Sequence, residues 1–283
     1  LLGYFTISEG YRIGNSNGVA PCPTPLPPNQ IACALPDEQQ FFPDKTTNFE
    51  LGIRSQWLDR RLTLNGSIYY IDWEDPQLAG TTENANLPIT LNGEGAESQG
   101  LELSFDALLS DNWSLRGSMA FTNAELSEDA PALLNTIVPP GFGPRVDVDG
   151  RAGDRLPGSP ERQGTLFVTY DTVVADALDL RVNYGVAAIG DVLTRTGNRA
   201  DGERLPGFTI HNASAILRGS NWTVQLYAEN VWNKFAVTGV RATRAFVQTV
   251  ENEDGDPVRV RRYYQDVLRP REFGLRFNYN FGF

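Results

Sequence analysis

The sequence has no long hydrophobic run. Only 41% of its 283 residues are hydrophobic, and no stretch approaches the ~18 consecutive apolar residues that a membrane-spanning helix requires. A helical membrane protein is therefore excluded. A membrane β-barrel is not excluded, because each of its strands needs an apolar residue only at every second position, on the lipid side.

Positive charge and histidine are also scarce. The formal net charge is −11, and because nucleic-acid binding depends on Lys and Arg that neutralise phosphates, we expect no nucleic-acid partner. The single histidine, His211, is the one candidate for a histidine general base or a Ser-His-Asp arrangement. We expect it to be a structural residue in a barrel wall. With no catalytic constellation, the sequence predicts neither an enzyme nor a bound cofactor.

Cysteine is rare, but its placement is informative. Cys22 and Cys33 lie in one Pro-rich loop. Such a pair suits a disulfide in an oxidising compartment, and two free thiols remain the alternative.

Apolar and polar residues alternate along the whole chain, which predicts strands with one apolar face. The last segment is the clearest, with Leu275, Phe277, Tyr279, Phe281 and Phe283 on one face. We predict ten strands, of which 205–218 alternates least well. Their ranges are 3–13, 47–58, 61–74, 97–109, 112–125, 161–172, 177–192, 205–218, 221–238 and 263–282.

Short and long connections alternate between these predicted strands. Tight turns are predicted near 59–60, 110–111, 175–176 and 219–220, and long Gly- and Pro-rich loops at 14–46, 75–96, 126–160, 193–204 and 239–262. Outer-membrane barrels have short periplasmic turns and long extracellular loops. The sequence therefore predicts an all-β, antiparallel transmembrane barrel in this orientation.

Large aromatic residues lie near the ends of the predicted strands, where a membrane barrel would meet the lipid headgroups. A soluble sandwich with these residues in its core is the alternative, but it gives no reason for the long loops to share one end. The residues are Trp57, Tyr70, Trp73, Trp113, Phe121, Trp222 and Trp232.

Charged residues fall on the strand faces opposite the apolar ones, as a polar lumen requires. We expect them to pair with one another and with whatever fills the lumen, because buried charges are tolerated when paired. A direct role in holding substrate is the alternative. The residues are Glu50, Arg54, Glu102, Asp106, Arg116, Asp179, Arg181, Glu229 and Arg276.

Two acidic loops are weak candidates for a cation site. One contains Asp147, Asp149 and Asp154, and the other is the cluster at 251–256. Their spacing is similar to that of calcium loops, but neither has the closing bidentate Glu of an EF-hand. Solvated loop charge is the favoured interpretation.

Five segments resemble the C-terminal β-barrel of TonB-dependent receptors, in the order in which that family has them. Together they span nearly the whole chain, which makes the set far more specific than any one member. They are YFTISEGYRI at 4–13, NFELGIRSQWLDRRLTLNGSIYYIDWE at 48–74, NGEGAESQGLELSFDALLSDNWSLRGSMAFTNAEL at 92–126, YAENVWNKFAV at 227–237 and RPREFGLRFNYNFGF at 269–283.

The resemblance implies a 22-strand barrel whose lumen is filled by a plug. Ten strands are about half of such a barrel, so we expect an incomplete half barrel that forms an open, curved sheet. Residues 1–283 would be the C-terminal part of the barrel domain, with the plug absent. The chain begins inside a strand, with no secretory signal before it, and we expect it to be a fragment.

The resemblance also implies a location and partners. Such receptors lie in the outer membrane of Gram-negative bacteria, in contact with lipid and lipopolysaccharide. They import a scarce small molecule or metal chelate, most often a ferric siderophore, with energy that the TonB complex delivers to the plug. Their closing strand is read by the barrel-assembly machinery, so that Leu275, Phe277, Tyr279, Phe281 and Phe283 would form the recognition face.

Two alternatives to an importer stay open. One is a self-contained ten-strand barrel that acts as a pore or an adhesin. The other is an outer-membrane protease, for which the sequence shows no suitable acidic grouping around His211.

Overall fold

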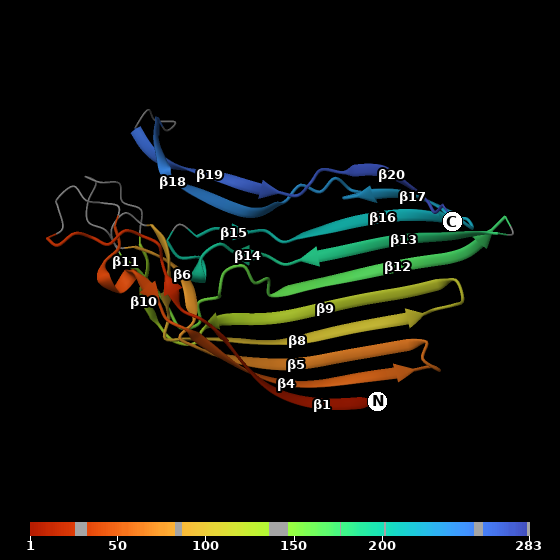
Figure 1. Ribbon diagram of the computed structural model, residues 1–283, viewed down its shortest axis with the longest axis horizontal. Helices are drawn as coiled ribbons and strands as arrows, with labels where there is room; N and C mark the ends of the chain where they lie inside the picture. The colour runs from red at the N-terminus through yellow and green to blue at the C-terminus, as the bar shows by residue number, and fades with distance from the viewer. Residues whose placement is uncertain are drawn as a thin grey trace.

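Ten long strands form one antiparallel sheet in the computed structural model, which describes residues 1–25, 33–82, 87–135, 147–175, 177–200, 202–251 and 257–281. Each long strand pairs with the next one along the chain, and in the described residues β1 and β20 do not pair with each other (Figure 1). The predicted all-β fold with an open ten-stranded sheet is confirmed. The strands are β1 (Leu2–Arg12), β4 (Asp44–Trp57), β5 (Leu62–Glu74), β8 (Gly95–Leu108), β9 (Trp113–Leu126), β12 (Arg162–Val174), β13 (Leu178–Ile189), β16 (Phe208–Arg218), β17 (Trp222–Glu229) and β20 (Glu272–Tyr279).

The two ends of the sheet differ. At one end, called here the turn end, tight turns join β4 to β5, β8 to β9, β12 to β13 and β16 to β17. At the other, the loop end, the long connections gather and contain two-stranded hairpins of their own (Figure 1). The hairpins are β2 (Asn15–Ser16) with β3 (Gln40–Phe41), β6 (Gln77–Thr81) with β7 (Pro88–Asn92), β10 (Ala130–Asn135) with β11 (Asp147–Gly150), β14 (Val192–Leu193) with β15 (Arg204–Leu205), and β18 (Val237–Glu251) with β19 (Pro257–Val267).

The prediction is wrong about the bounds of the last two strands. The strand predicted at 221–238 ends at Glu229, and the range 263–282 is divided between β19 and β20. In the loop predicted at 239–262, residues 239–251 belong to β18 and residues 257–262 to β19. Asn230 ends β17, because its φ is positive and its buried side chain binds the backbone of Lys234 and Arg269. On the facing segment, Pro270 has no N–H to donate to a strand ladder.

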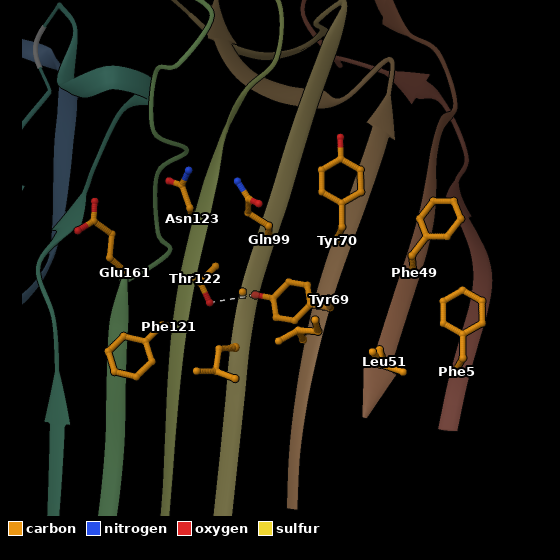
Figure 2. A pocket seen from close by; sticks show the side chains of 13 residues that line it. Phe5, Phe49, Leu51, Tyr69, Tyr70, Gln99, Phe121, Thr122, Asn123 and Glu161 are labelled. Atoms are coloured by element: carbon orange, nitrogen blue, oxygen red, sulfur yellow. Dashed lines mark hydrogen bonds between the residues drawn. The ribbon is translucent and has the colours of Figure 1, made fainter. Parts of the chain in front are cut away.

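The register divides the sheet into an apolar face and a polar face. Phe5, Leu51, Ile68, Leu101 and Phe121 lie side by side on β1, β4, β5, β8 and β9, and therefore share one face. Phe5 is 62% exposed and Leu51 54%, and several of these side chains line a shallow hollow on the sheet (Figure 2). An exposed apolar surface of this extent needs a cover, and lipid is what a barrel places there.

The main buried core lies at the loop end, away from the long sheet faces. Leu78 of β6, Leu126 of β9, Leu133 of β10 and Leu156 pack together, with Trp73 of β5 against them. The loops therefore form a folded cap on the sheet. Among the described residues, no helix is both long and apolar enough to cross a membrane.

Candidate functional site: the polar face and the loop end

Small polar side chains cover the middle of the polar face. Arg54, Asn65, Ser104, Ser118 and Thr165 lie in one row across β4, β5, β8, β9 and β12. Asn65 is 3.4 Å from the hydroxyl of Ser104, and the hydroxyls of Ser118 and Thr165 are 2.8 Å apart. The row forms a hydrogen-bonding wall that can face water or a polar partner.

Two tyrosines organise charged residues on this face. Tyr4 of β1 donates a 2.5 Å hydrogen bond to Glu50, and the guanidinium of Arg54 lies 5.4 Å from the Tyr4 ring centre. At the far side of the sheet, the guanidinium of Arg276 lies 6.0 Å from the centre of the Tyr227 ring. A cation over an aromatic ring is attracted by the electrons of the ring face. Three of the predicted lumen charges therefore lie beside a tyrosine of the preceding long strand.

Two ion pairs lie on the polar face toward the turn end. Arg116 of β9 pairs with Asp106 of β8, and Arg181 of β13 pairs with Asp171 of β12 at 2.7 Å. All four side chains are exposed, so the pairs contribute little to stability where water surrounds them. Asp171 was not among the residues singled out from the sequence, since only the register shows that it faces Arg181.

The register also places the remaining predicted lumen charges on the polar face. Glu102 lies between Ser67 and Ala120, and Asp179 lies opposite Arg218. Glu229 of β17 lies directly opposite Glu272 of β20, so two carboxylates face each other at the loop end of the last strand pair. Like charges in this position repel unless a partner lies between them.

The predicted aromatic residues separate into two levels on the apolar face, with one exception. Trp57, Trp113 and Trp222 lie at the turn end, and Tyr70 and Phe121 lie toward the loop end. Trp232, which follows the loop end of β17, contacts Tyr184 and His211 on this face. At about 3.4 Å per residue, Trp113 and Phe121 are about 27 Å apart along β9. A strand tilt of about 40° reduces this to about 21 Å across the membrane, which fits within the ~25 Å apolar band of a membrane barrel.

Trp73 is the exception, and its prediction as a girdle residue is wrong. It falls on the polar face, where its indole nitrogen donates a 2.9 Å hydrogen bond to Asp44. Asp44 is 3% exposed and also accepts hydrogen bonds from Arg12 and from the backbone N–H of Gln77. Nothing in the sequence pattern indicated this buried carboxylate, because its partners are distant along the chain.

His211 lies on the apolar face of β16. Its Nδ1 is 2.8 Å from the hydroxyl of Tyr184, and that hydroxyl accepts a 3.2 Å hydrogen bond from the indole of Trp232. His211 and Trp232 also meet edge to face, with ring centres 6.3 Å apart. These contacts are aromatic, and the expectation that His211 is a structural residue stays a prediction.

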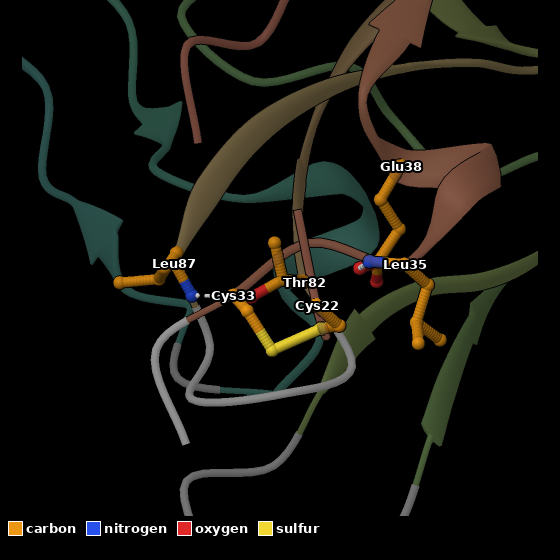
Figure 3. Close-up of a disulfide and its surroundings, with 6 residues drawn as sticks. All are labelled: Cys22, Cys33, Leu35, Glu38, Thr82 and Leu87. Carbon is orange, nitrogen blue, oxygen red and sulfur yellow. Dashed lines mark hydrogen bonds between the residues drawn. A yellow bond between two sulfur atoms is a disulfide. The ribbon is translucent and has the colours of Figure 1, made fainter. Parts of the chain in front are cut away.

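Cys22 and Cys33 form a disulfide in the structure (Figure 3). It lies beside the segment in which Thr82 accepts a hydrogen bond from the backbone N–H of Leu87. The bond also ties together the two ends of the loop, whose backbones are paired between Cys22 and Ala34. The disulfide therefore closes the segment from Cys22 to Cys33 within the first long loop.

Arginines surround the carboxylates of the first acidic loop. Asp149 is 3.0 Å from Arg151, and Asp154 pairs with Arg199 and accepts a hydrogen bond from the backbone N–H of Arg151. The side chains of Asp147 and Glu251, and residues 252–256 of the second acidic cluster, lie outside the described residues. Among the residues that the structure does describe, no group of three or more His, Cys, Asp or Glu could hold a metal ion.

A second arginine cluster joins two loops. Asp191 lies 2.8 Å from Arg204 and 2.9 Å from Arg155, and Arg155 is also 3.4 Å from Glu161. The hydrogen bond from Arg204 lowers the pKa of Asp191 to about 2, with a further contribution from Arg155 and partial opposition from desolvation. The cluster fixes the β13–β16 connection against the segment that leads into β12.

The residues of the predicted assembly signal lie in β20 and just after it. Leu275, Phe277 and Tyr279 point to the apolar face and are exposed, and Phe281 packs against Tyr279 with ring centres 4.7 Å apart. Phe283 lies outside the described residues.

A comparison with known protein families identifies the family to which this sheet belongs. Residues 1–231 match the family model described as "TonB dependent receptor-like, beta-barrel". The chain belongs to this family. Members are outer-membrane proteins of Gram-negative bacteria, and the chain is an outer-membrane barrel segment, as its sequence predicts.

Individual relatives agree with this assignment. The chain is 22% identical, over 200 residues, to the probable TonB-dependent siderophore receptor PiuA of Acinetobacter baumannii, a match that covers 70% of this chain and 24% of the relative. Two solved structures share the fold. The ferric yersiniabactin uptake receptor FyuA from Yersinia pestis has a TM-score of 0.65 at 16% identity, covering 99% of this chain and 35% of the receptor. The copper transporter OprC has a TM-score of 0.60 at 15% identity, covering 99% and 37%.

The matched regions also show how much of such a protein the sequence covers. The chain spans about a quarter of the length of the curated relative and about a third of the length of the solved structures.

Proposed function

We propose that residues 1–283 are the C-terminal part of the barrel wall of a receptor that imports a ferric siderophore across the outer membrane. The observation that carries the proposal is the polar face. Its charges and hydroxyls extend from the Asp106–Arg116 and Asp171–Arg181 pairs at the turn end to Asp44 at the loop end. A wall with this character suits a wide lumen that holds a polar plug and passes a polar cargo.

The loop end supports the same proposal. Five hairpins, the disulfide and the arginine clusters lie together at that end among the described residues, beyond the apolar band. Folded loops of this kind offer a preformed surface where cargo can bind before it enters the lumen. The probable siderophore receptor PiuA and the ferric yersiniabactin receptor FyuA favour a ferric siderophore, and OprC keeps another metal chelate as the second choice.

The proposal includes the partners that the family uses. Energy would come from the TonB complex acting through a plug in the lumen. The exposed edge strand β20 would be read by the barrel-assembly machinery through Leu275, Phe277, Tyr279, Phe281 and Phe283, and the apolar face would contact lipid. No observation favours the pore, adhesin or protease alternatives. The ten long strands form an open sheet among the described residues, and the partners of His211 are aromatic rather than acidic.

Uptake by living cells tests the proposal. A strain that lacks the gene is compared with the same strain carrying the gene on a plasmid, during iron limitation, with a panel of radiolabelled ferric chelates and a copper chelate. We expect the gene to restore saturable uptake of one ferric chelate, and a protonophore to abolish that uptake because transport needs the inner-membrane gradient. Uptake that is unsaturable and insensitive to the protonophore would indicate a pore and contradict the proposal.

A further inference from the structure

The polar face contains a strip without charge, called here the neutral strip. It consists of every second residue of 163–169 in β12, 183–189 in β13 and 208–214 in β16, three strands that lie side by side (Figure 1). Over these described ranges, no residue on the polar face is charged. Phe208 and Ile210 of β16 even turn apolar side chains to this face, and for this reason the alternation of β16 is the weakest in the sequence.

The wall on both sides of the neutral strip carries charge. On β8, Glu102 and Asp106 lie on either side of the row that contains Ala187. On β17 and β20, Glu229 and Glu272 face each other. Like charges in such a pair repel unless a partner from outside the sheet lies between them. The flanking strands therefore call for charged partners in the lumen, and the neutral strip does not.

Polar groups of the neutral strip already have partners within the wall. The hydroxyl of Thr169 donates a 2.9 Å hydrogen bond to the side-chain carbonyl of Asn183, and the amide of Asn183 donates one of 3.2 Å to the hydroxyl of Ser214. The hydroxyl of Thr165 is paired with that of Ser118 at 2.8 Å. Because these groups are paired, a polar surface that lies against the strip gains little from the contact.

The neutral strip is also recessed. Gly185 has no side chain, and the ring of Phe167 lies over it, so that a Cβ atom added to Gly185 would be 2.7 Å from this ring. A hollow of about 300 Å³ opens here, with Asn212 in its lining. A second hollow of about 760 Å³ reaches Thr165 and Ala187 from the side of β4 and β5. Space is thus present along the strip before anything moves.

The neutral strip extends along most of β12. From Gln163 to Thr169 it covers about 20 Å at about 3.4 Å per residue. A strand tilt of about 40° reduces this to about 16 Å across the membrane, which is most of the ~25 Å apolar band. Toward the turn end it reaches Asp171 and Arg181, which neutralise each other at 2.7 Å. The strip therefore connects the loop end with the turn end without an unpaired charge on its way.

We propose that the neutral strip borders the passage by which the cargo crosses the lumen. The inference rests on the proposed function, in which a polar plug fills the barrel. Hydrogen bonds to charged groups are roughly twice as strong as those between neutral groups, so the charged strands hold the plug most firmly and the strip holds it least. When the plug is loosened, its contact with the strip opens first. A wall that binds only weakly then lets a polar cargo move on instead of retaining it.

Thiol labelling during transport tests this inference. Ala187→Cys places a thiol in the neutral strip, and the matched control Ser67→Cys places one on the polar face of β5, directly opposite Glu102. Cys22 and Cys33 are joined in a disulfide and do not react, and the unsubstituted receptor gives the background. Cells that carry the whole gene receive a membrane-impermeant maleimide, with and without the ferric chelate that supports uptake, and with and without a protonophore.

We expect the chelate to raise the labelling rate of Ala187→Cys at least about fivefold, and that of Ser67→Cys less than about twofold, because the rate follows the population of the open state. The protonophore should cancel the rise. Labelled Ala187→Cys receptor should still bind the chelate but no longer import it, since the adduct fills the passage.

Three outcomes would overturn the inference in cells that import the chelate: equal rises at the two positions, a larger rise at Ser67→Cys, or no rise at Ala187→Cys. If Ala187→Cys does not reach the outer membrane, Thr165→Cys in the same row is labelled instead, with the same expected result. If the unsubstituted receptor imports no chelate, the proposed function fails and this inference fails with it, and the uptake measurement shows that case separately.

Discussion

The ring of Tyr227 on β17 lies over Gly274 on β20. A Cβ atom added to Gly274 would be 2.2 Å from the Cζ atom of this ring, which no real contact allows. Tyr4 covers Gly52 in the same way between β1 and β4, and Tyr69 covers Gly100 between β5 and β8. On the polar face, an aromatic ring thus repeatedly fills the space left by a glycine on the next strand, a device that holds strand register.

Gly274→Ala should therefore destabilise the receptor. The added methyl group forces Tyr227 off its position, and overpacking of this kind typically costs about 1–3 kcal/mol. Thermal unfolding of the receptor in detergent, followed by loss of its compact band in gels, measures the effect. Gly3→Ala is the control, because nothing lies within 4 Å of a Cβ at that position. A Gly274→Ala receptor as stable as the Gly3→Ala receptor would show that the ring does not depend on the glycine.

The two faces of the sheet should respond differently to a new charge. Leu166 points to the apolar face of β12 near its middle, and Thr165, its neighbour, points to the polar face. Leu166→Arg should cost about 2–4 kcal/mol, since it places a charge in the lipid near the bilayer centre, whereas Thr165→Arg should cost far less. The amount of folded receptor in isolated outer membranes gives the comparison. Equal yields of the two variants would argue against the assignment of the faces.

Asp191 should make the loop end sensitive to acid. Its pKa is lowered to about 2 from an ordinary value near 3.8, so its stabilising effect is complete above about pH 5 and is lost progressively as the pH falls through 2. Asp191→Asn should lower the free energy of unfolding of the loop connection by about 1–2 kcal/mol at pH 7, because Arg155 and Arg204 lose their shared carboxylate.

Hydrogen exchange of residues 190–207 in the wild type and in Asp191→Asn, at pH 6 and near pH 2.5, measures this effect after correction for intrinsic exchange rates. The two proteins should differ at pH 6, and the difference should shrink to about a third of that value near pH 2.5. A difference that persists unchanged at the lower pH would mean that Asp191 acts through something other than its charge.

The disulfide should protect the first long loop rather than the sheet. A bond between residues 11 positions apart restricts the open loop by about 3 kcal/mol in the chain-entropy description. The double variant Cys22→Ser with Cys33→Ser should be cut by added protease in the 14–46 loop of intact cells much faster than the wild type, while thermal unfolding of the barrel stays unchanged. Wild-type cells treated with a reductant should show the same cleavage; resistance in both would contradict the prediction.

The sequence by itself determined the ten long strands, their two faces and the alternation of tight turns with long loops. These features are local, because a strand repeats every two residues and each apolar position can be recognised from its neighbours in the chain. The row from Phe5 to Phe121 on one face, and the opposite placement of Arg54 and Arg276, follow from that period alone.

The tertiary structure decided what depends on partners far apart in the sequence. The period of two already places Trp73 on the face opposite Tyr70, three positions away, but only the structure shows its contact with Asp44. The strand predicted to reach residue 238 stops where Asn230 binds Arg269. The rings over Gly52 and Gly274 likewise required the register. A pattern along the chain shows which side of a strand a residue faces, but only the pairing of strands shows which residue lies opposite it.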